Sequence, residues 1–97
     1  KNGSLRHVLK WVRSLGQYGD GNNAFREPNS LAWLDSGKLA VVDTNAHCIK
    51  VFDSETGQFL YSFGRGRTAG CQNLLYPYRI AVVPGGEDQL VVIQRHP

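Results

Sequence analysis

Two cysteines and three histidines are the side chains of this 97-residue sequence best suited to metal binding or nucleophilic catalysis. Cys48 precedes an apolar segment and Cys71 lies in a glycine-rich one, and their spacing matches neither a metal motif nor a disulfide framework. The histidines near the two ends are not spaced from either cysteine as zinc ligands are. His47 is expected to be structural, with its ring bound to nearby backbone or to an aspartate such as Asp43. We therefore predict two reduced thiols, no metal or other cofactor, and a cytoplasmic location.

Three aspartates are the candidates for paired catalytic carboxylates. Asp35, Asp43 and Asp53 each follow an apolar run and stand beside Gly, Thr or Ser, a pattern that is typical of turns. The sequence contains no nucleophile elbow, phosphate-binding loop or dinucleotide fingerprint. Nothing in this pattern supports an enzyme.

The composition is that of an ordinary globular protein and excludes few partners. Hydrophobic residues make up 41% of the chain, and the formal net charge is +3. This mild positive charge is compatible with a polyanionic partner without requiring one. No apolar run approaches the length of a membrane span, so no membrane association is expected. Because the sequence starts at Lys1 and has no methionine, we expect it to be a piece of a longer chain.

Four short strands separated by turns are predicted in the middle of the sequence, at residues 31–34, 39–42, 49–52 and 58–63. The first two are continuous apolar runs, which are typical of strands buried on both faces. The third alternates apolar and polar residues, as a strand with one solvated face does. Trp33, on the first strand, is therefore expected in the core. A sheet that runs from a packed centre to an exposed edge is the organisation of a β-propeller blade.

An internal repeat supports this interpretation. Residues 14–16 and 62–64 each combine Ser, a large apolar residue and Gly, and each precedes a loop that contains several glycines. Both loops end at an apolar residue and a proline before a strand, and these prolines, Pro28 and Pro77, lie 49 positions apart. A period of about 40–50 residues with four short strands per unit is the signature of a β-propeller.

We predict an all-β fold and interpret the chain as a partial segment of a propeller. The repeat divides it into three parts. Residues 1–15 are predicted to be a polar entry and the outer strand of a preceding blade, residues 16–63 a first repeat, and residues 64–97 a second, incomplete repeat. Strands are expected at 79–83 and 90–93. Isolated blades expose apolar faces and unpaired edges, so we expect self-association or the remaining blades to cover them.

Two segments carry a family resemblance. Residues 43–52 (Asp-Thr-Asn-Ala-His-Cys-Ile-Lys-Val-Phe), with the glycine-rich loop before them, resemble an NHL repeat, in which Cys48 replaces a usually basic residue. Residues 74–83 (Leu-Leu-Tyr-Pro-Tyr-Arg-Ile-Ala-Val-Val) are similar to the second blade of the Brain tumor class of TRIM-NHL proteins. The resemblance implies a six-bladed propeller that recognises U-rich single-stranded RNA for translational repression.

The resemblance also implies RNA contacts. Asn45, Tyr76 and Arg95 match RNA-contacting positions of the class and would lie at loop ends on one rim, with Arg79 adding positive potential. A tyrosine ring offers a face on which a base stacks, an asparagine both donates and accepts hydrogen bonds, and an arginine binds phosphate or stacks on a base. Each residue also has a structural alternative: Asn45 caps its turn, Tyr76 packs under a loop, and Arg95 is an ordinary solvated side chain.

Other interpretations remain open at this point. A protein-interaction propeller that presents substrates to an upstream RING ubiquitin ligase module of the TRIM type is the main alternative. A propeller lyase of the peptide-amidating type is a weaker one, because it would be secreted and would use its cysteines in disulfides. Arg65 and Arg67 stand between small residues and are expected to decorate a solvated loop.

Overall fold

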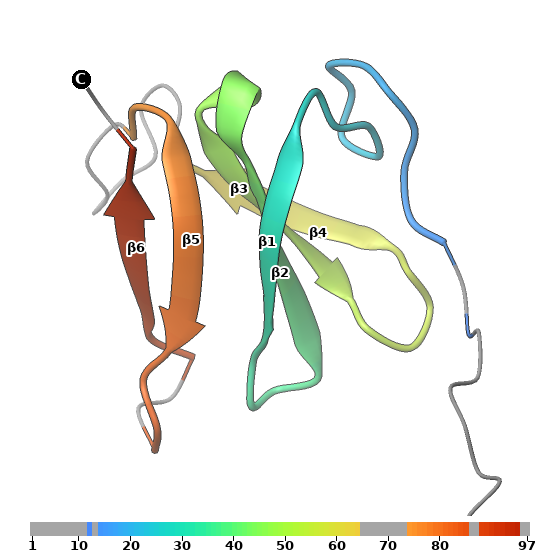
Figure 1. The fold of residues 1–97 in the computed structure, drawn as a ribbon. Coiled ribbons are helices and arrows are strands. Elements are labelled where there is room, and N and C mark those ends of the chain that lie inside the picture. The colour runs from blue at the N-terminus through green and yellow to red at the C-terminus, as the bar shows by residue number, and fades with distance from the viewer. Residues whose placement is uncertain (1–11, 13, 65–73, 86–87, 96–97) are drawn as a thin grey trace, which may run out of the picture.

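Two antiparallel sheets make up the fold in the computed structural model, which describes residues 12, 14–64, 74–85 and 88–95 (Figure 1). The first sheet has four strands in the order β1-β2-β3-β4, and the second has two, β5 and β6. Within the described residues, no helix is long and apolar enough to cross a membrane. The bounds are β1 Pro28–Trp33, β2 Lys38–Asp43, η2 (a single 3-10 turn) Thr44–Ala46, β3 Cys48–Asp53, β4 Phe59–Phe63, β5 Pro77–Val82 and β6 Leu90–Gln94.

The four-stranded sheet is a propeller blade, as predicted. Each strand pairs with the next one in the sequence, so the chain forms a simple antiparallel meander. The six strands predicted in the described residues are present, and most extend into the flanking turns by one to three residues. The outer strand predicted before residue 16 falls largely on residues 1–11 and 13, outside the described part of the chain.

The second sheet packs face to face on the first, with β5 lying beside β1 and β2 (Figure 1). The core between them is centred on Val42, Ile49 and Val51, which are almost completely buried. Ile80 and Val82 of β5 pack against this cluster from the other sheet. Each fully buried aliphatic side chain contributes about 1.5–3 kcal/mol, so this interface holds the two sheets together.

The opposite face of the blade has a smaller core. Phe52 is buried there between Phe25, at a ring distance of 5.6 Å, and Phe59, at 5.8 Å. Leu39 and Val41 of β2 complete this cluster. The loop that carries Phe25 is thereby fixed against the blade.

The burial of the strands differs from the prediction in two places. Trp33 is 62% exposed and Leu31 56%, because both line an open cavity beside Leu39 and Val41 instead of packing in a closed core. The core position expected for Trp33 is therefore wrong for this chain. The third strand, expected to have one solvated face, is buried on both, because its polar residue Lys50 is buried in an ion pair with Asp43.

Two glycines at equivalent positions of the repeat, Gly16 and Gly64, have the same structural environment. Gly16 and Gly64 both adopt positive φ, +80° and +108°, and each lies under the large apolar residue that ends the following loop. A Cβ on Gly64 would lie 2.5 Å from Leu74 Cδ1, and one on Gly16 would overlap the Phe25 ring. Because neither position has room for a side chain, the glycine and the apolar residue form one structural unit in each repeat.

Candidate functional site

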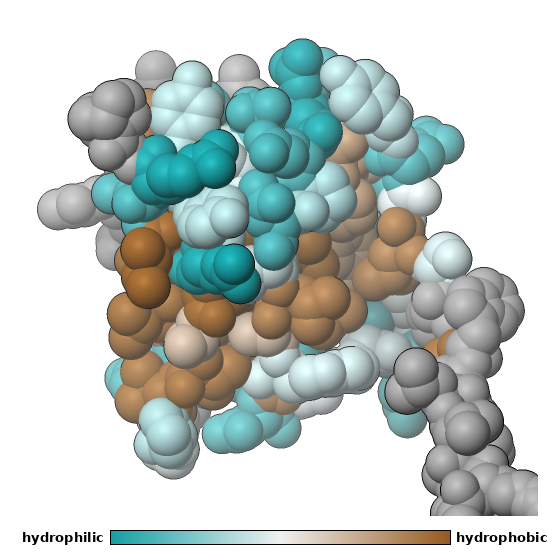
Figure 2. Space-filling view, viewed as in Figure 1, coloured by the Kyte–Doolittle hydropathy of each residue, from teal (hydrophilic) through white to brown (hydrophobic). Residues whose placement is uncertain are grey.

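One rim of the two sheets gathers the polar and aromatic candidates. We call it the upper rim, since it lies at the top of Figure 1, where η2, the start of β5 and the end of β6 meet. Figure 2 shows that hydrophilic residues cover this rim, whereas the surface below it is largely apolar. The upper rim comprises Asn45, His47, Tyr76, Tyr78, Arg79 and Arg95.

The segment leading into β5 is fixed at four successive residues. Each of residues 74–77 makes at least one hydrogen bond to another part of the structure, and four of these bonds hold the backbone around Tyr76. The four bonds are Leu74 N to Gly64 O (2.5 Å), Leu75 N to Gln94 Oε1 (2.7 Å), Tyr76 N to His47 Nδ1 (3.0 Å) and Thr44 Oγ1 to Pro77 O (2.7 Å).

His47 and Tyr76 join the two sheets at this rim. The backbone N–H of Tyr76 donates to His47 Nδ1, and the two rings meet edge to face with their centres 4.4 Å apart. Both residues have positive φ, 58° for His47 and 47° for Tyr76, which is uncommon for residues with side chains. Tyr76 remains 38% exposed. It therefore packs at its edge and still offers surface to a ligand.

Asn45 lies exposed at the middle of η2, and the structure does not use it as a cap. The residue at the cap position is Asp43, which makes no side-chain capping hydrogen bond. The turn is held instead by buried Thr44, whose hydroxyl accepts from Asn29 Nδ2 at 2.7 Å and donates to the carbonyl of Pro77. Within the described residues, the Asn45 side chain makes no hydrogen bond, so its amide faces solvent.

Arg79 and Arg95 meet at a third residue that the sequence analysis did not single out. The ring centre of Tyr78 lies 5.0 Å from the guanidinium carbon of Arg79 and 4.7 Å from that of Arg95. The backbone N–H of Arg95 also donates to the carbonyl of Tyr76 at 2.8 Å. The segment Tyr-Pro-Tyr-Arg places two aromatic residues and one basic residue within four positions, which indicates an aromatic and basic surface but not that Tyr78 contacts both arginines.

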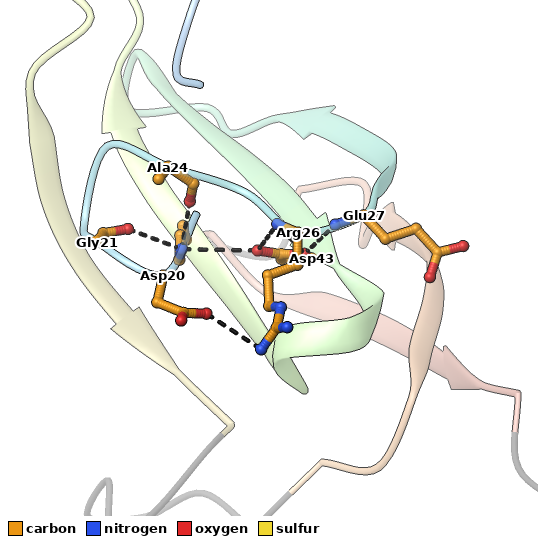
Figure 3. A network of polar contacts seen from close by, with 7 residues as sticks. Asp20, Gly21, Ala24, Arg26, Glu27 and Asp43 are labelled. Carbon is orange, nitrogen blue, oxygen red and sulfur yellow. Dashed lines mark hydrogen bonds and ion pairs between the residues drawn. The ribbon is translucent and has the colours of Figure 1, made fainter. Parts of the chain in front are cut away.

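A buried ion pair lies beneath the rim (Figure 3). Asp43 is completely buried, and its carboxylate accepts from the backbone N–H groups of Arg26 (2.9 Å) and Glu27 (2.7 Å). Lys50 Nζ lies 3.6 Å from the same carboxylate. Asp43 is therefore a buried anchor and not a turn residue, and the His47 ring is hydrogen-bonded to Tyr76 instead of to Asp43.

Lys50 extends this network to the loop before β1. Its ammonium donates to the carbonyls of Gly21 (3.0 Å) and Ala24 (2.5 Å), which are labelled in Figure 3. The ammonium also lies 5.3 Å from the ring centre of Phe25. Arg26, in the same loop, pairs with Asp20 at 3.3 Å. A hydrogen bond with the Tyr18 side chain, together with the Asp20 carboxylate, raises the pKa of Arg26 above its usual range. Both cations of this network are thus paired with carboxylates of the same blade.

The opposite rim contains a second link between the sheets. Asp88, in the β5–β6 turn, accepts from the Ser36 hydroxyl at 2.5 Å and from the Ser36 backbone N–H at 3.3 Å. These bonds, with Lys38 at 3.9 Å, lower the pKa of Asp88 below its ordinary value. The two sheets are therefore joined by polar contacts at both ends of their apolar interface.

Several residues named in the sequence analysis lie outside the described part of the chain. These are Arg65, Arg67, Cys71 and the histidines near the two ends. Cys48 is buried at the start of β3. Within the described ranges, no group of three or more His, Cys, Asp or Glu side chains is placed to hold a metal ion.

Comparisons with known proteins agree with this architecture. The family model of the NHL repeat matches residues 25–52, from the end of the glycine-rich loop through most of β3. Over 92 residues the chain is 39% identical to Protein brain tumor of Drosophila melanogaster, an alignment that spans 95% of this chain and 9% of that protein. Residues 25–52 therefore match the NHL repeat, and the chain as a whole resembles a short part, less than a tenth, of Protein brain tumor.

Proposed function

We propose that this NHL-repeat segment binds U-rich single-stranded RNA at its upper rim and acts in translational repression in the cytoplasm. The observation that carries the proposal is the meeting of Asn45, Tyr76 and Arg95 on one rim, although they come from three separate parts of the sequence. The backbone N–H groups of Tyr76 and Arg95 are hydrogen-bonded, and all three residues are exposed, so their side chains are accessible to a ligand.

The chemistry of the three residues suits a single strand with unpaired bases. A base stacks on the exposed part of the Tyr76 ring, an interaction worth about 1–3 kcal/mol that tolerates any base. The amide of Asn45 donates to and accepts from the edge of a uracil, which supplies the base preference. Arg95 and Arg79 bind the phosphates.

Further blades of a six-bladed ring complete the structure in this proposal. Leu31 and Ile80 occupy equivalent positions, three residues after Pro28 and Pro77 respectively. Ile80 packs on the neighbouring sheet, whereas Leu31 is exposed, and Val91 on β6 is exposed as well. Each outer face therefore presents to solvent the kind of surface that the chain buries between its own two sheets. A blade on either side would cover these faces in the same way.

Fluorescence anisotropy with the intact propeller containing this segment tests the RNA proposal. A short U-rich RNA is titrated at two salt concentrations, beside a C-rich RNA of equal length. We expect salt-sensitive binding that prefers the U-rich strand and weakens about tenfold or more in Tyr76→Ala, because a base stack is lost. Tyr61→Ala is the matched control, since Tyr61 is 43% exposed on β4, away from the rim.

The main alternative is a protein-interaction propeller that presents substrates to a TRIM-type ubiquitin ligase. Absence of RNA binding, or binding indifferent to Tyr76, Asn45 and Arg95, would contradict the RNA proposal and favour this alternative. Salt dependence separates them further, since release of counterions from phosphates makes RNA binding weaken steeply with salt.

A further inference from the structure

The ring of Tyr78 lies on the upper rim but is not one of the groups that contact RNA in the proposed function. Tyr78 is the second residue of β5 and lies at an irregularity in the strand pairing. Its neighbours in β5 pair as Pro77 with Gln94 and Arg79 with Ile93, so Tyr78 is an extra residue without a partner across the sheet. Such a bulge redirects a side chain that would otherwise follow the alternation of the strand.

The redirected ring lies against two cations. The guanidinium carbons of Arg79 and Arg95 are 5.0 and 4.7 Å from its centre, within the range of cation–π attraction. Within the described residues, neither guanidinium forms an ion pair with a carboxylate. Two positive charges thus lie against one ring without a carboxylate partner among the described residues, and this local positive potential favours an anionic ligand.

We propose that Tyr78 is a positioning residue that holds Arg79 and Arg95 together as a two-guanidinium clamp for the phosphate backbone of the bound strand. The inference rests on the proposed function of this rim. The clamp adjoins the stacking site, because Arg95 donates its backbone N–H to the carbonyl of Tyr76. A base on Tyr76 therefore places the adjoining phosphates next to the two guanidiniums.

In this proposal Tyr76 and Tyr78 have different roles. The ring of Tyr76 meets its neighbour His47 only edge to face, at 4.4 Å between ring centres, and stacks a base. The ring of Tyr78 is occupied by guanidiniums and acts on the strand only through them. Fixed arginines lose less side-chain entropy when they bind, so the ring raises affinity without touching RNA.

The internal repeat provides a substitution that removes the ring and suits the backbone. Asn29 occupies in β1 the position of Tyr78 in β5, next to the corresponding proline and at the corresponding irregularity of pairing. Tyr78→Asn therefore deletes the ring with a residue that this site already holds in the first blade. Tyr78→Phe keeps the ring and is the conservative variant.

The first readout uses the RNA-free propeller. In nuclear magnetic resonance spectra, the side-chain N–H protons of Arg79 and Arg95 are expected to be shifted by the ring current of Tyr78. The shift should persist in Tyr78→Phe and disappear in Tyr78→Asn. Unchanged arginine resonances in Tyr78→Asn would overturn the positioning role, whatever the protein binds.

The second readout is RNA affinity and its salt dependence. We expect Tyr78→Asn to bind U-rich RNA about fivefold more weakly, with a salt slope smaller by about 0.7 for each phosphate that is no longer neutralised, and Tyr78→Phe to match the unsubstituted protein. In an Arg79→Gln/Arg95→Gln background, Tyr78→Asn should have no further effect. A full additional loss there would overturn the inference by showing that Tyr78 contacts RNA itself. Failure of the unsubstituted protein to bind RNA would instead overturn the proposed function.

Discussion

The imidazole Nδ1 of His47 accepts the backbone N–H of Tyr76 at 3.0 Å, and this bond connects the two sheets at the rim where the candidate ligands of RNA lie. His47 follows η2 in the first blade, and Tyr76 directly precedes β5 in the second. Because Tyr76 has a φ of 47°, its backbone needs support from its surroundings to keep this conformation. The orientation of the Tyr76 ring therefore depends on a residue in the other blade.

Replacing His47 should weaken RNA binding without removing a direct contact. His47→Ala loses the acceptor for the Tyr76 N–H and the edge-to-face ring contact, and we expect affinity to fall about three- to tenfold. His47→Asn is the matched control, because asparagine tolerates the φ of 58° and offers an oxygen as acceptor. Anisotropy titrations compare the two variants, and equal affinities would contradict the dependence of Tyr76 on this hydrogen bond.

Gly64→Ala should destabilise the propeller more than Gly37→Ala. Both glycines have positive φ, which costs about 1–2 kcal/mol for alanine. Only at Gly64 would the new Cβ also overlap Leu74, which adds about 1–3 kcal/mol, whereas Gly37 faces open space. Chemical denaturation measures the two free energies of unfolding. If the two variants are equally stable, then the glycine–leucine contact does not constrain the second repeat.

Removing Asp43 should cost about 3–5 kcal/mol, since Asp43→Ala leaves the buried ammonium of Lys50 without its counter-charge. In a Lys50→Met background the same substitution should cost less, because no charge is then left unpaired. Equilibrium unfolding of the two single variants and the double variant gives this coupling. Strictly additive effects would show that the pair does not act as a unit.

The link between Ser36 and Asp88 should make stability depend on pH in the acid range. The hydrogen bonds from Ser36 lower the pKa of Asp88 in the folded protein, so the stability they contribute is present above the ordinary carboxyl pKa of about 4. It is lost as the pH falls through the lower folded-state pKa. Ser36→Ala should therefore be less stable than the unsubstituted protein at neutral pH, with the difference vanishing in acid. A difference that is constant across this range would contradict the linkage.

The strands were predictable because local patterns determine them. Short apolar runs bounded by Asp, Asn, Ser and Gly define β1 to β4, and the repeat of Pro28 at Pro77 locates the second sheet. The burial of individual faces was less predictable. Alternation in β3 suggested a solvated face, but Lys50 is buried because its ammonium finds one carboxylate and two carbonyls. These partners lie in distant segments, and periodicity cannot reveal them.

The sequence predicted where the candidate site lies but not all of the residues that form it. Asn45, Tyr76 and Arg95 come together on one rim as the resemblance implied, while their contact with RNA remains a prediction. Tyr78 was missed because its role arises from the bulge between Pro77 and Arg79, which redirects its ring. A bulge depends on the pairing of two strands, so a single strand's sequence does not indicate it.

Photo-crosslinking with a U-rich RNA that carries 4-thiouridine tests the central claim most directly. The intact propeller is irradiated with the RNA, digested, and analysed by mass spectrometry to locate the linked residues. We predict crosslinks at Tyr76 and in the adjoining upper-rim segments around Asn45 and Arg95. Crosslinks confined to the opposite rim around Ser36 and Asp88, with RNA bound, would contradict the account.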